Sequence, residues 1–356
     1  MLFNERVTTI TQDKMIPAII DGILNSNVLF MRSMLSGAKV WSGENIKKPI
    51  KISKSATGGA FSGMAVFDVS ATNTRKKLQF EPKAFYQNVT IPGIEKAVNG
   101  TDAQVLSLVK VQLEEAQADA YDALGDILYG TGAGDAFEGL GNIVDDGTSI
   151  DSYGGLSRAT YSQIKATKTA AAGGILTLAT MATLMASVAA AGSGRQRPSL
   201  GLCDETVWNL YEKLLQPTVS ANYSANGYPQ VTAFTAPGQM VSNGSALAGT
   251  QGFAAVTYRG LPIVADEKAN SGVLFFLNEL YLNWYRLTDS GLQTIPMGGD
   301  VLDGVYKESK FKSPFQWTGW KTPTNQYGDC GQFIAMGNFI GDNPRRQGKL
   351  TSITTS

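Results

Sequence analysis

The most regular apolar pattern in the chain lies between Thr101 and Gly130, where apolar residues recur at three- and four-residue spacings. They are Val105, Leu108, Val109, Leu113, Ala116, Ala120, Leu124, Ile127 and Leu128. This spacing places them on one face of a helix. Thr101 suits the N-cap position, and Gly130 suits the position after the last turn. The pattern predicts a helix over residues 101–129, about 42 Å long, which could serve as a beam for other parts of the chain.

The segment before this helix has the alternation of extended chain. Ile50 and Ile52 alternate with polar residues, a stretch rich in Gly, Ser and Ala follows, and a second extended run covers residues 78–91. This pattern predicts a β-hairpin of two long strands over residues 46–93, with a mobile tip. Such a hairpin is marginal alone and should need a partner. Residues 1–45 are predicted to form an arm that lies against another element.

The segment after the helix contains stretches with the apolar spacing of helices and short apolar runs typical of strands. A helix is predicted over residues 177–191, and a second helix is predicted to begin at Asp204 and to stop at Pro217. Strands are predicted at residues 199–203, 254–258, 262–265, 273–277, 281–285 and 332–340. Helices and strands in this order favour a mixed sheet with helices on its faces.

Composition narrows the classes of function. Only 17% of the 356 residues are charged and 43% are hydrophobic, which favours a surface covered by copies of the same chain. Formal net charge is zero, so nothing indicates strong global attraction to nucleic acid. The chain has no histidine, the commonest catalytic base and metal ligand, which lowers the expectation of an enzyme. Cys203 and Cys330 fit no metal or redox spacing, and we expect two reduced, buried thiols. Without a signal peptide or a membrane span, we expect a cytosolic origin.

Charge is unevenly distributed within this neutral chain. Residues 46–90 hold eight basic and two acidic residues, a balance of +6, whereas residues 101–129 hold one basic and six acidic residues, a balance of −5. The simplest interpretation is two separately solvated faces. A sharper hypothesis is that the basic arm lies over the acidic helix of a neighbouring copy, where opposite potentials would fix the register. Reversal of Lys76 and Lys77 to Glu would then impair assembly.

Three motifs are candidates for chemistry. The glycines of GTGAGD (residues 130–135) suggest a nucleotide loop, but they follow a helix instead of a strand, so a flexible turn is the better interpretation. The adjacent carboxylates Asp145–Asp146 and Glu114–Glu115 could serve a hydrolase. Neighbours on a helix point apart, however, and Asp145–Asp146 precede Gly147 in what we expect to be a turn. Arg195 and Arg197 are either solvated or in contact around a symmetry axis.

The order of these parts, together with two phrases, resembles a known family. The phrases are YRGLPIVADEKANSGVLFFLNELYLNW (residues 258–284) and GNFIGDNPRRQGKL (residues 337–350). Nearly the whole chain resembles the major capsid proteins of tailed bacteriophages with the Hong Kong ninety-seven type of fold, an α+β fold. A bacterial nanocompartment (encapsulin-like) shell protein of the same fold is the alternative, and a carboxylate-dependent hydrolase is the alternative from another class.

The resemblance implies a division of the chain. It gives an N-terminal arm (1–45), an extended β-hairpin loop (46–93), a peripheral domain (94–150 and 301–356) with a spine helix (101–129), and an axial domain (151–300).

The resemblance also implies partners. Copies would form hexamers and pentamers of an icosahedral virion shell, assembled in the host bacterial cytoplasm around double-stranded DNA that is contacted without sequence readout. A separate scaffolding protein and a portal are implied, a decoration protein is an open option, and neither a cofactor nor a membrane is expected. No motif marks a crosslinking pair, so we do not expect covalent crosslinks. The expected assembly contacts are Lys47, Lys48, Lys51, Lys54, Arg75, Lys76, Lys77, Glu114, Glu115, Asp119, Asp122, Arg195, Arg197, Arg345 and Arg346.

Overall fold

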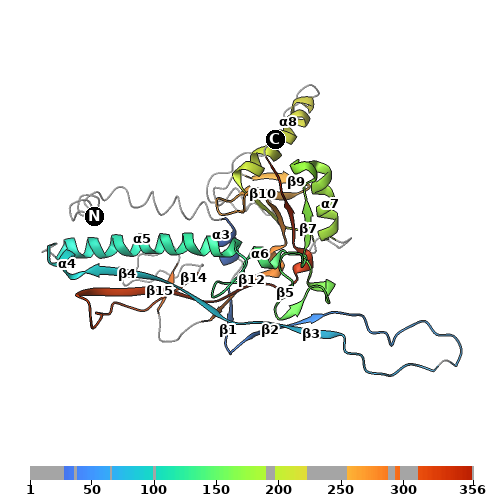
Figure 1. Cartoon of the computed structure of the whole chain (residues 1–356), viewed down its shortest axis with the longest axis horizontal. Helices are drawn as coiled ribbons and strands as arrows, with labels where there is room; N and C mark the ends of the chain where they lie inside the picture. The colour runs from blue at the N-terminus through green and yellow to red at the C-terminus, as the bar shows by residue number, and fades with distance from the viewer. Residues whose placement is uncertain are drawn as a thin grey trace.

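The structure is a computed structural model of the 356-residue chain. It describes residues 28–35, 38–64, 66–98, 102–189, 197–222, 255–287, 293–296 and 312–354. Among these, the elements form an elongated molecule with a long helix beside one sheet, a second sheet with its own helices, and a projecting ribbon (Figure 1).

The long helix α5 covers Asp102–Tyr129, which confirms the predicted spine helix, although its N-cap residue Thr101 is outside the described residues. It lies along a six-stranded sheet (Figure 1). The strands of this sheet are β1 (Lys39–Trp41), β4 (Lys83–Pro92), β12 (Leu282–Leu287), β13 (Gln293–Pro296), β14 (Lys312–Trp317) and β15 (Gly328–Gly341). Strand β15 is central, because it pairs with β12, β14 and β4, and its antiparallel ladder with β4 is ten residues long.

The apolar stripe of α5 is what attaches the helix to this sheet. Leu113, Ala120, Leu124 and Leu128 are buried in one core with residues of the sheet such as Phe333. Burial of these side chains supplies most of the attachment, at roughly 1.5–3 kcal/mol for each large one.

Part of the predicted N-terminal arm packs on the same core. Helix α3 (Val28–Leu35) places Phe30 with its ring centroid 5.3 Å from that of Tyr121 on α5. Residues 1–27 are outside the described residues.

The second sheet has six strands and mixed direction. Its order is β7 (Thr167–Ala170), β16 (Gly348–Thr351), β11 (Leu274–Leu277), β8 (Leu200–Cys203), β10 (Leu261–Ala265) and β9 (Ala255–Tyr258). The pairs β8–β10 and β7–β16 are parallel and the others antiparallel, so the predicted mixed sheet is confirmed.

Helices α7 (Leu178–Ala189) and α8 (Glu205–Asn222) pack on this second sheet. The predicted cap of α8 is confirmed, because the N–H of Val207 donates to Asp204 Oδ1. The predicted stop at Pro217 is wrong, since α8 continues to Asn222. A proline removes one hydrogen bond of the ladder without ending every helix.

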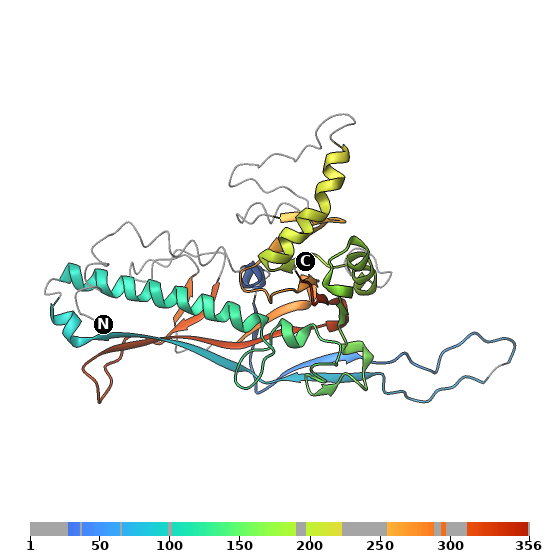
Figure 2. The same cartoon turned by 45° about the horizontal axis from the view of Figure 1, so that its top comes forward.

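The predicted hairpin is shorter than expected. Strands β2 (Ile46–Lys51) and β3 (Arg75–Phe80) pair in antiparallel register over six residues, and the tip between them holds no strand among its described residues. The second extended run (78–91) is divided at Glu81–Pro82, since β3 pairs with β2 whereas β4 joins the sheet beneath α5. The ribbon and its tip project away from the rest of the molecule (Figures 1 and 2).

Short elements complete the described chain. They are α4 (Gly93–Val98), α6 (Leu140–Ile143), the strand pair β5 (Ser152–Tyr153) and β6 (Leu156–Ser157), and 3₁₀ turns at residues 162–164, 172–174, 279–281 and 344–346.

Candidate assembly surfaces

The register of the β2–β3 ribbon sorts its basic residues onto two faces. Lys47 is opposite Gln79, Pro49 is opposite Lys77, and Lys51 is opposite Arg75. Residues opposite one another share a face, and the faces alternate along a strand. One face therefore carries four cations, which are Lys47, Lys51, Arg75 and Lys77, all of them exposed. We call these four residues the basic face.

The other face of the ribbon turns toward the body of the molecule. It carries Ile46, Leu78 and Phe80, all buried, and also Lys48. The Lys48 ammonium lies 3.2 Å from Asp342 Oδ2 and 4.8 Å from the Tyr285 ring centroid. Burial lowers the pKa of Lys48, but its hydrogen bonds to Tyr285 and Asp342 outweigh burial, so the pKa lies above its ordinary value. Lys48 therefore holds the ribbon to its own chain.

Two further lysines of the expected set are exposed elsewhere. Lys54 lies beyond the paired strands, in the tip. Lys76 shares the inner face with Ile50 and lines a cleft of about 610 Å³ between β3 and the β5–β6 pair. The lining of this cleft also includes Glu81 and Glu138, so it carries both signs of charge.

The acidic residues of α5 form a stripe along the helix. Glu115, Asp119, Asp122 and Asp126 follow spacings of four, three and four residues, which share one helical face. Glu115 and Asp119 are exposed. Glu114 lies in α5, but its side chain is outside the described part of the structure.

The C-terminal half of this stripe is paired within the chain. Lys268, in the turn after β10, has its ammonium 2.8 Å from Asp122 Oδ1 and 3.2 Å from Asp126 Oδ1. Burial lowers the pKa of Lys268, but the hydrogen bonds to Asp122 and Asp126 prevail and the pKa is raised. The charges left for a partner are therefore those of Glu115 and Asp119.

The expected arginine contacts have different environments. Arg346 donates from Nη1 to the carbonyl oxygens of Val188 and Ala189, at 3.3 and 3.2 Å, where a cation stabilises the C-terminal end of α7. Arg345 and Arg197 are exposed, and Arg195 is outside the described residues.

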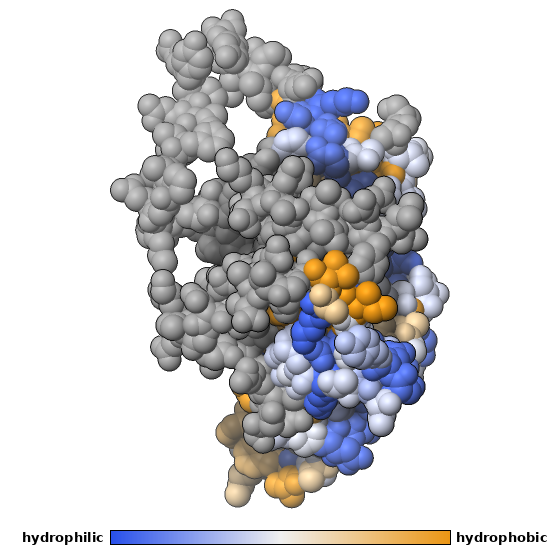
Figure 3. All heavy atoms as spheres, turned by 90° about the vertical axis from the view of Figure 1, so that its left-hand side faces the viewer, coloured by the Kyte–Doolittle hydropathy of each residue, from blue (hydrophilic) through white to orange (hydrophobic). Residues whose placement is uncertain are grey.

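Exposed apolar side chains, which the charge pattern gave no reason to expect, gather at both ends of the molecule. At the ribbon tip they are Phe61, Met64, Val66, Phe67 and Val69, and Met64 and Val66 are almost fully exposed. At the opposite end, α4 exposes Ile94 and Val98. Figure 3 shows that end, with a small hydrophobic patch among hydrophilic residues. Exposed apolar clusters of this kind are typical of surfaces that contact another molecule.

The glycine-rich turn after α5 binds a side chain of the sheet. Lys83 Nζ donates to the carbonyl oxygens of Gly132, Gly134 and Ala136, at 3.1, 2.8 and 2.7 Å. A phosphate site would need converging N–H groups, whereas here carbonyl oxygens converge on a cation. The structure agrees with a turn and not with a nucleotide loop.

The candidate carboxylates Asp145 and Asp146 close turns, as expected. Asp145 is 1% exposed, and its Oδ1 accepts the N–H groups of Gly147, Ser149 and Ile150. Asp146 Oδ1 accepts both the N–H and the hydroxyl of Thr148. Each carboxylate is thus held by its own loop, which is unlike a pair that flanks a substrate.

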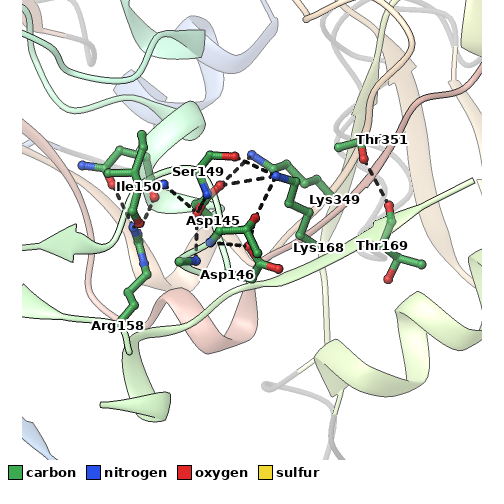
Figure 4. Close-up of polar contacts among 12 residues, drawn as sticks. Asp145, Asp146, Ser149, Ile150, Arg158, Lys168, Thr169, Lys349 and Thr351 are labelled. Atoms are coloured by element: carbon green, nitrogen blue, oxygen red, sulfur yellow. Dashed lines mark hydrogen bonds and ion pairs between the residues drawn. The ribbon is translucent and has the colours of Figure 1, made fainter. Parts of the chain in front are cut away.

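Asp145 also bridges two lysines of the second sheet (Figure 4). Lys168 on β7 and Lys349 on β16 are paired in register, and their ammonium groups lie 3.9 and 3.8 Å from Asp145 Oδ2. Burial lowers the pKa of Lys349, while Asp145 opposes that shift. The carboxylate offsets the repulsion between two neighbouring cations and fastens this edge of the sheet to the turn after α6.

Arg158 completes the polar core beside this turn. It is fully buried, and it donates to the carbonyl oxygens of Ile150, Asn142 and Ile164 (Figure 4). Among the described residues, no group of three acidic, Cys or His side chains could hold a metal ion, and no helix is long and apolar enough to cross a membrane.

Comparison with known proteins identifies the fold. No family model matches the sequence, and no curated sequence matches it. The capsid protein of cyanophage A-1(L) superposes with a TM-score of 0.62 at 15% identity, covering 89% of this chain and 90% of that chain. The chain has the fold of tailed-phage capsid proteins. This agrees with the expected α+β capsid fold.

Two other solved shells share this capsid fold with the chain. The capsid of a native GTA particle matches with a TM-score of 0.50 at 11% identity, covering 90% of this chain and 89% of that chain. The SrpI encapsulin of Synechococcus elongatus matches with a TM-score of 0.52 at 10% identity, covering 90% and 87%. The fold is therefore common to capsids and to an encapsulin shell.

Proposed function

We propose that this chain is the major capsid protein of a tailed phage, and that it self-assembles into the hexamers and pentamers of an icosahedral shell around double-stranded DNA. The observation that carries this proposal is the match to the cyanophage capsid protein over nearly the full length of both chains. The projecting ribbon supports it, because an exposed apolar tip on a two-stranded ribbon needs a second molecule to cover it.

The contact between copies places the basic face of one ribbon over the acidic stripe of a neighbouring α5. Arg75 and Lys77 are two residues apart on a strand, about 6.8 Å. Glu115 and Asp119 are four residues apart on a helix, about 6 Å. The two pairs of charges therefore match in spacing as well as in sign. Charges of this kind steer the encounter and fix the register more than they add affinity.

Charge reversal tests this contact. The double variant Arg75→Glu with Lys77→Glu should fold normally but fail to assemble, and adding Glu115→Lys with Asp119→Lys should restore particles. Lys213→Glu, which reverses an exposed cation on α8 that is not among the expected assembly contacts, is the matched control. Normal assembly of the double variant at low salt, where surface charges act most strongly, would contradict the contact.

The surroundings of the proposed shell follow from the same function. The expected divisions are an arm, an extended loop, a peripheral domain around α5 and an axial domain around the second sheet. In the structure, β12 lies in the sheet beneath α5 and the C-terminal β16 lies in the second sheet. We therefore propose that β12 belongs to the peripheral domain and β16 to the axial domain. A separate scaffolding protein and a portal would act during assembly in the bacterial cytoplasm, and the DNA would be contacted without sequence readout. A decoration protein on the finished virion stays an open option. No catalytic step is assigned to the chain.

Electron microscopy of the purified chain is the decisive experiment. Closed shells or ring-shaped capsomers are the expected result, and a compact monomer with enzymatic turnover would overturn the proposal. The similarity to an encapsulin favours one alternative, a nanocompartment that encloses an enzyme. Extraction of particles produced in the native host distinguishes the two, since a capsid yields DNA whereas a nanocompartment yields a cargo protein.

A further inference from the structure

One buried carboxylate connects three parts of the chain that are far apart in sequence. Asp266 follows β10 in the second sheet and is 1% exposed. Its Oδ2 accepts the N–H of Leu29, at the start of α3, at 2.9 Å, and the hydroxyl of Tyr129, the last residue of α5, at 2.8 Å. Its Oδ1 accepts the N–H of Lys268 at 3.0 Å. A single side chain thus joins the arm, the spine helix and the second sheet.

The same turn holds α5 at a second point. The Lys268 ammonium pairs with Asp126 and Asp122, which lie about one and two turns before Tyr129. Because the two attachments are on successive turns, the turn after β10 fixes both the position and the rotation of the helix end. Two separate points define an orientation, whereas one point alone does not.

An apolar side chain could fill the space of Asp266, but it could not provide this directionality. Burial of the carboxylate is costly and raises the pKa of Asp266, while the donors from Leu29, Lys268 and Tyr129 act in the opposite direction. A buried charge with several donors tolerates few arrangements of them, whereas apolar packing tolerates many. The group therefore contributes geometry more than stability.

We propose that Asp266 is the positioning residue that sets the angle between α5 and the second sheet, and that ties the start of α3 to that angle. The consequence for assembly rests on the proposed capsid function. A closed shell requires a fixed angle between the parts of each copy, because this angle determines the curvature of the surface that the copies form. We call the contacts of Asp266 with α3, α5 and the turn after β10 the joint. A joint that allowed more than one angle would give particles of more than one diameter.

Amide hydrogen exchange of the unassembled full chain tests the joint without reference to the shell. In Asp266→Asn, the amides of α3 and of residues 122–129 should exchange about tenfold faster or more, as expected for the loss of hydrogen bonds to a buried charge. Amides of α7, in the same molecule but far from the joint, should be unchanged. Tyr129→Phe, which keeps the ring against Phe275, should show a smaller effect confined to the same segments.

Two controls separate positioning from general stability. Asp146→Asn removes a carboxylate whose side-chain hydrogen bonds stay within its own turn, far from α3, and it should leave exchange in α3 and α5 unchanged. Particles of Asp266→Asn should show a broader distribution of diameters than the parent chain in electron micrographs. Unchanged exchange at α3 and α5, an equal increase over the whole chain, or an unaltered diameter distribution would each overturn the proposal. If the parent chain forms no shells, the capsid function fails, whereas the exchange measurement still decides on the joint.

Discussion

The ammonium of Lys83 lies 2.7 Å from the carbonyl oxygen of Ala136, and this contact ties the turn after the spine helix to strand β4. Lys83→Met should loosen the turn, because the carbonyl oxygens of Gly132, Gly134 and Ala136 lose their shared donor. We expect a decrease of about 1.5–3 kcal/mol in the free energy of unfolding, measured by chemical denaturation. Lys83→Arg, which keeps the charge, is the comparison, and equal stability of the Met variant and the parent would show that the contact is weak.

Gly337 permits the close approach of β12 and β15. Its φ is +149°, and a Cβ atom there would lie 2.0 Å from the carbonyl oxygen of Tyr285. Since that neighbour is backbone, Gly337→Ala should force the two central strands apart and cost about 2–3 kcal/mol in thermal or chemical unfolding. Gly59→Ala is the control, because no atom lies within 4 Å of its Cβ position. A change of the same size in both variants would contradict the steric explanation.

The buried guanidinium of Arg158 supports the turns on either side of it. Burial lowers the pKa of Arg158, and the charge of Asp145 is the main opposing influence. Arg158→Met should lower the free energy of unfolding by about 3–5 kcal/mol, because it leaves the carbonyl oxygens of Asn142, Ile150 and Ile164 without their buried donor. Arg345→Met removes an exposed guanidinium and should change the free energy of unfolding by about 0.5 kcal/mol or less. Denaturant titrations of both variants decide the matter.

Glu138 gives stability a dependence on pH that can be isolated by mutation. Burial raises the pKa of Glu138 above its ordinary value of 4.5, despite the hydrogen bond from Asn142 and the charge of Lys83. The folded chain therefore holds this proton more tightly than the unfolded chain, and stability falls as the pH rises from 4.5 through the folded-state pKa.

Glu138→Gln, which cannot ionise, should be more stable than the parent at pH 7 and equal to it below pH 4.5. Unfolding free energies across this range measure the difference, with Glu115→Gln on the exposed face of α5 as the control. A variant that is less stable than the parent at pH 7 would show that the charge of Glu138 is favourable.

Helices and strands with a regular pattern of apolar residues could be predicted from the sequence. The apolar stripe, together with Thr101 and Gly130 at its ends, predicted the bounds of the spine helix within a residue. The strands around Ile263 and Phe276 were predicted from short apolar runs. The division of the run 78–91 between two sheets could not be predicted. Both halves are extended, and only the choice of pairing partner, β2 or β15, distinguishes them.

The sequence predicted which segments carry the charged residues of the candidate contacts, but not which of these residues are available on the surface. The sequence showed a basic arm and an acidic helix, yet it did not show that Lys48 is bound to Asp342 or that Lys268 is bound to Asp122. Both partners lie more than a hundred residues away, so no local spacing reports them. The contact between copies remains a proposal, and the structure adds which of the charged residues are not already paired within the chain.

The sequence by itself determined the long amphipathic helix, the two kinds of extended segment and the segregation of charge, because each depends on residues that are near one another along the chain. Tertiary structure alone decided that Asp266 joins α3, α5 and the second sheet, and that Lys47, Lys51, Arg75 and Lys77 share one face. These relationships depend on strand register and on long-range packing. The free energy of a buried hydrogen bond or a strand pair depends on the identity of its partner. Here the partners are distant in sequence, so the local spacing of residues does not predict them.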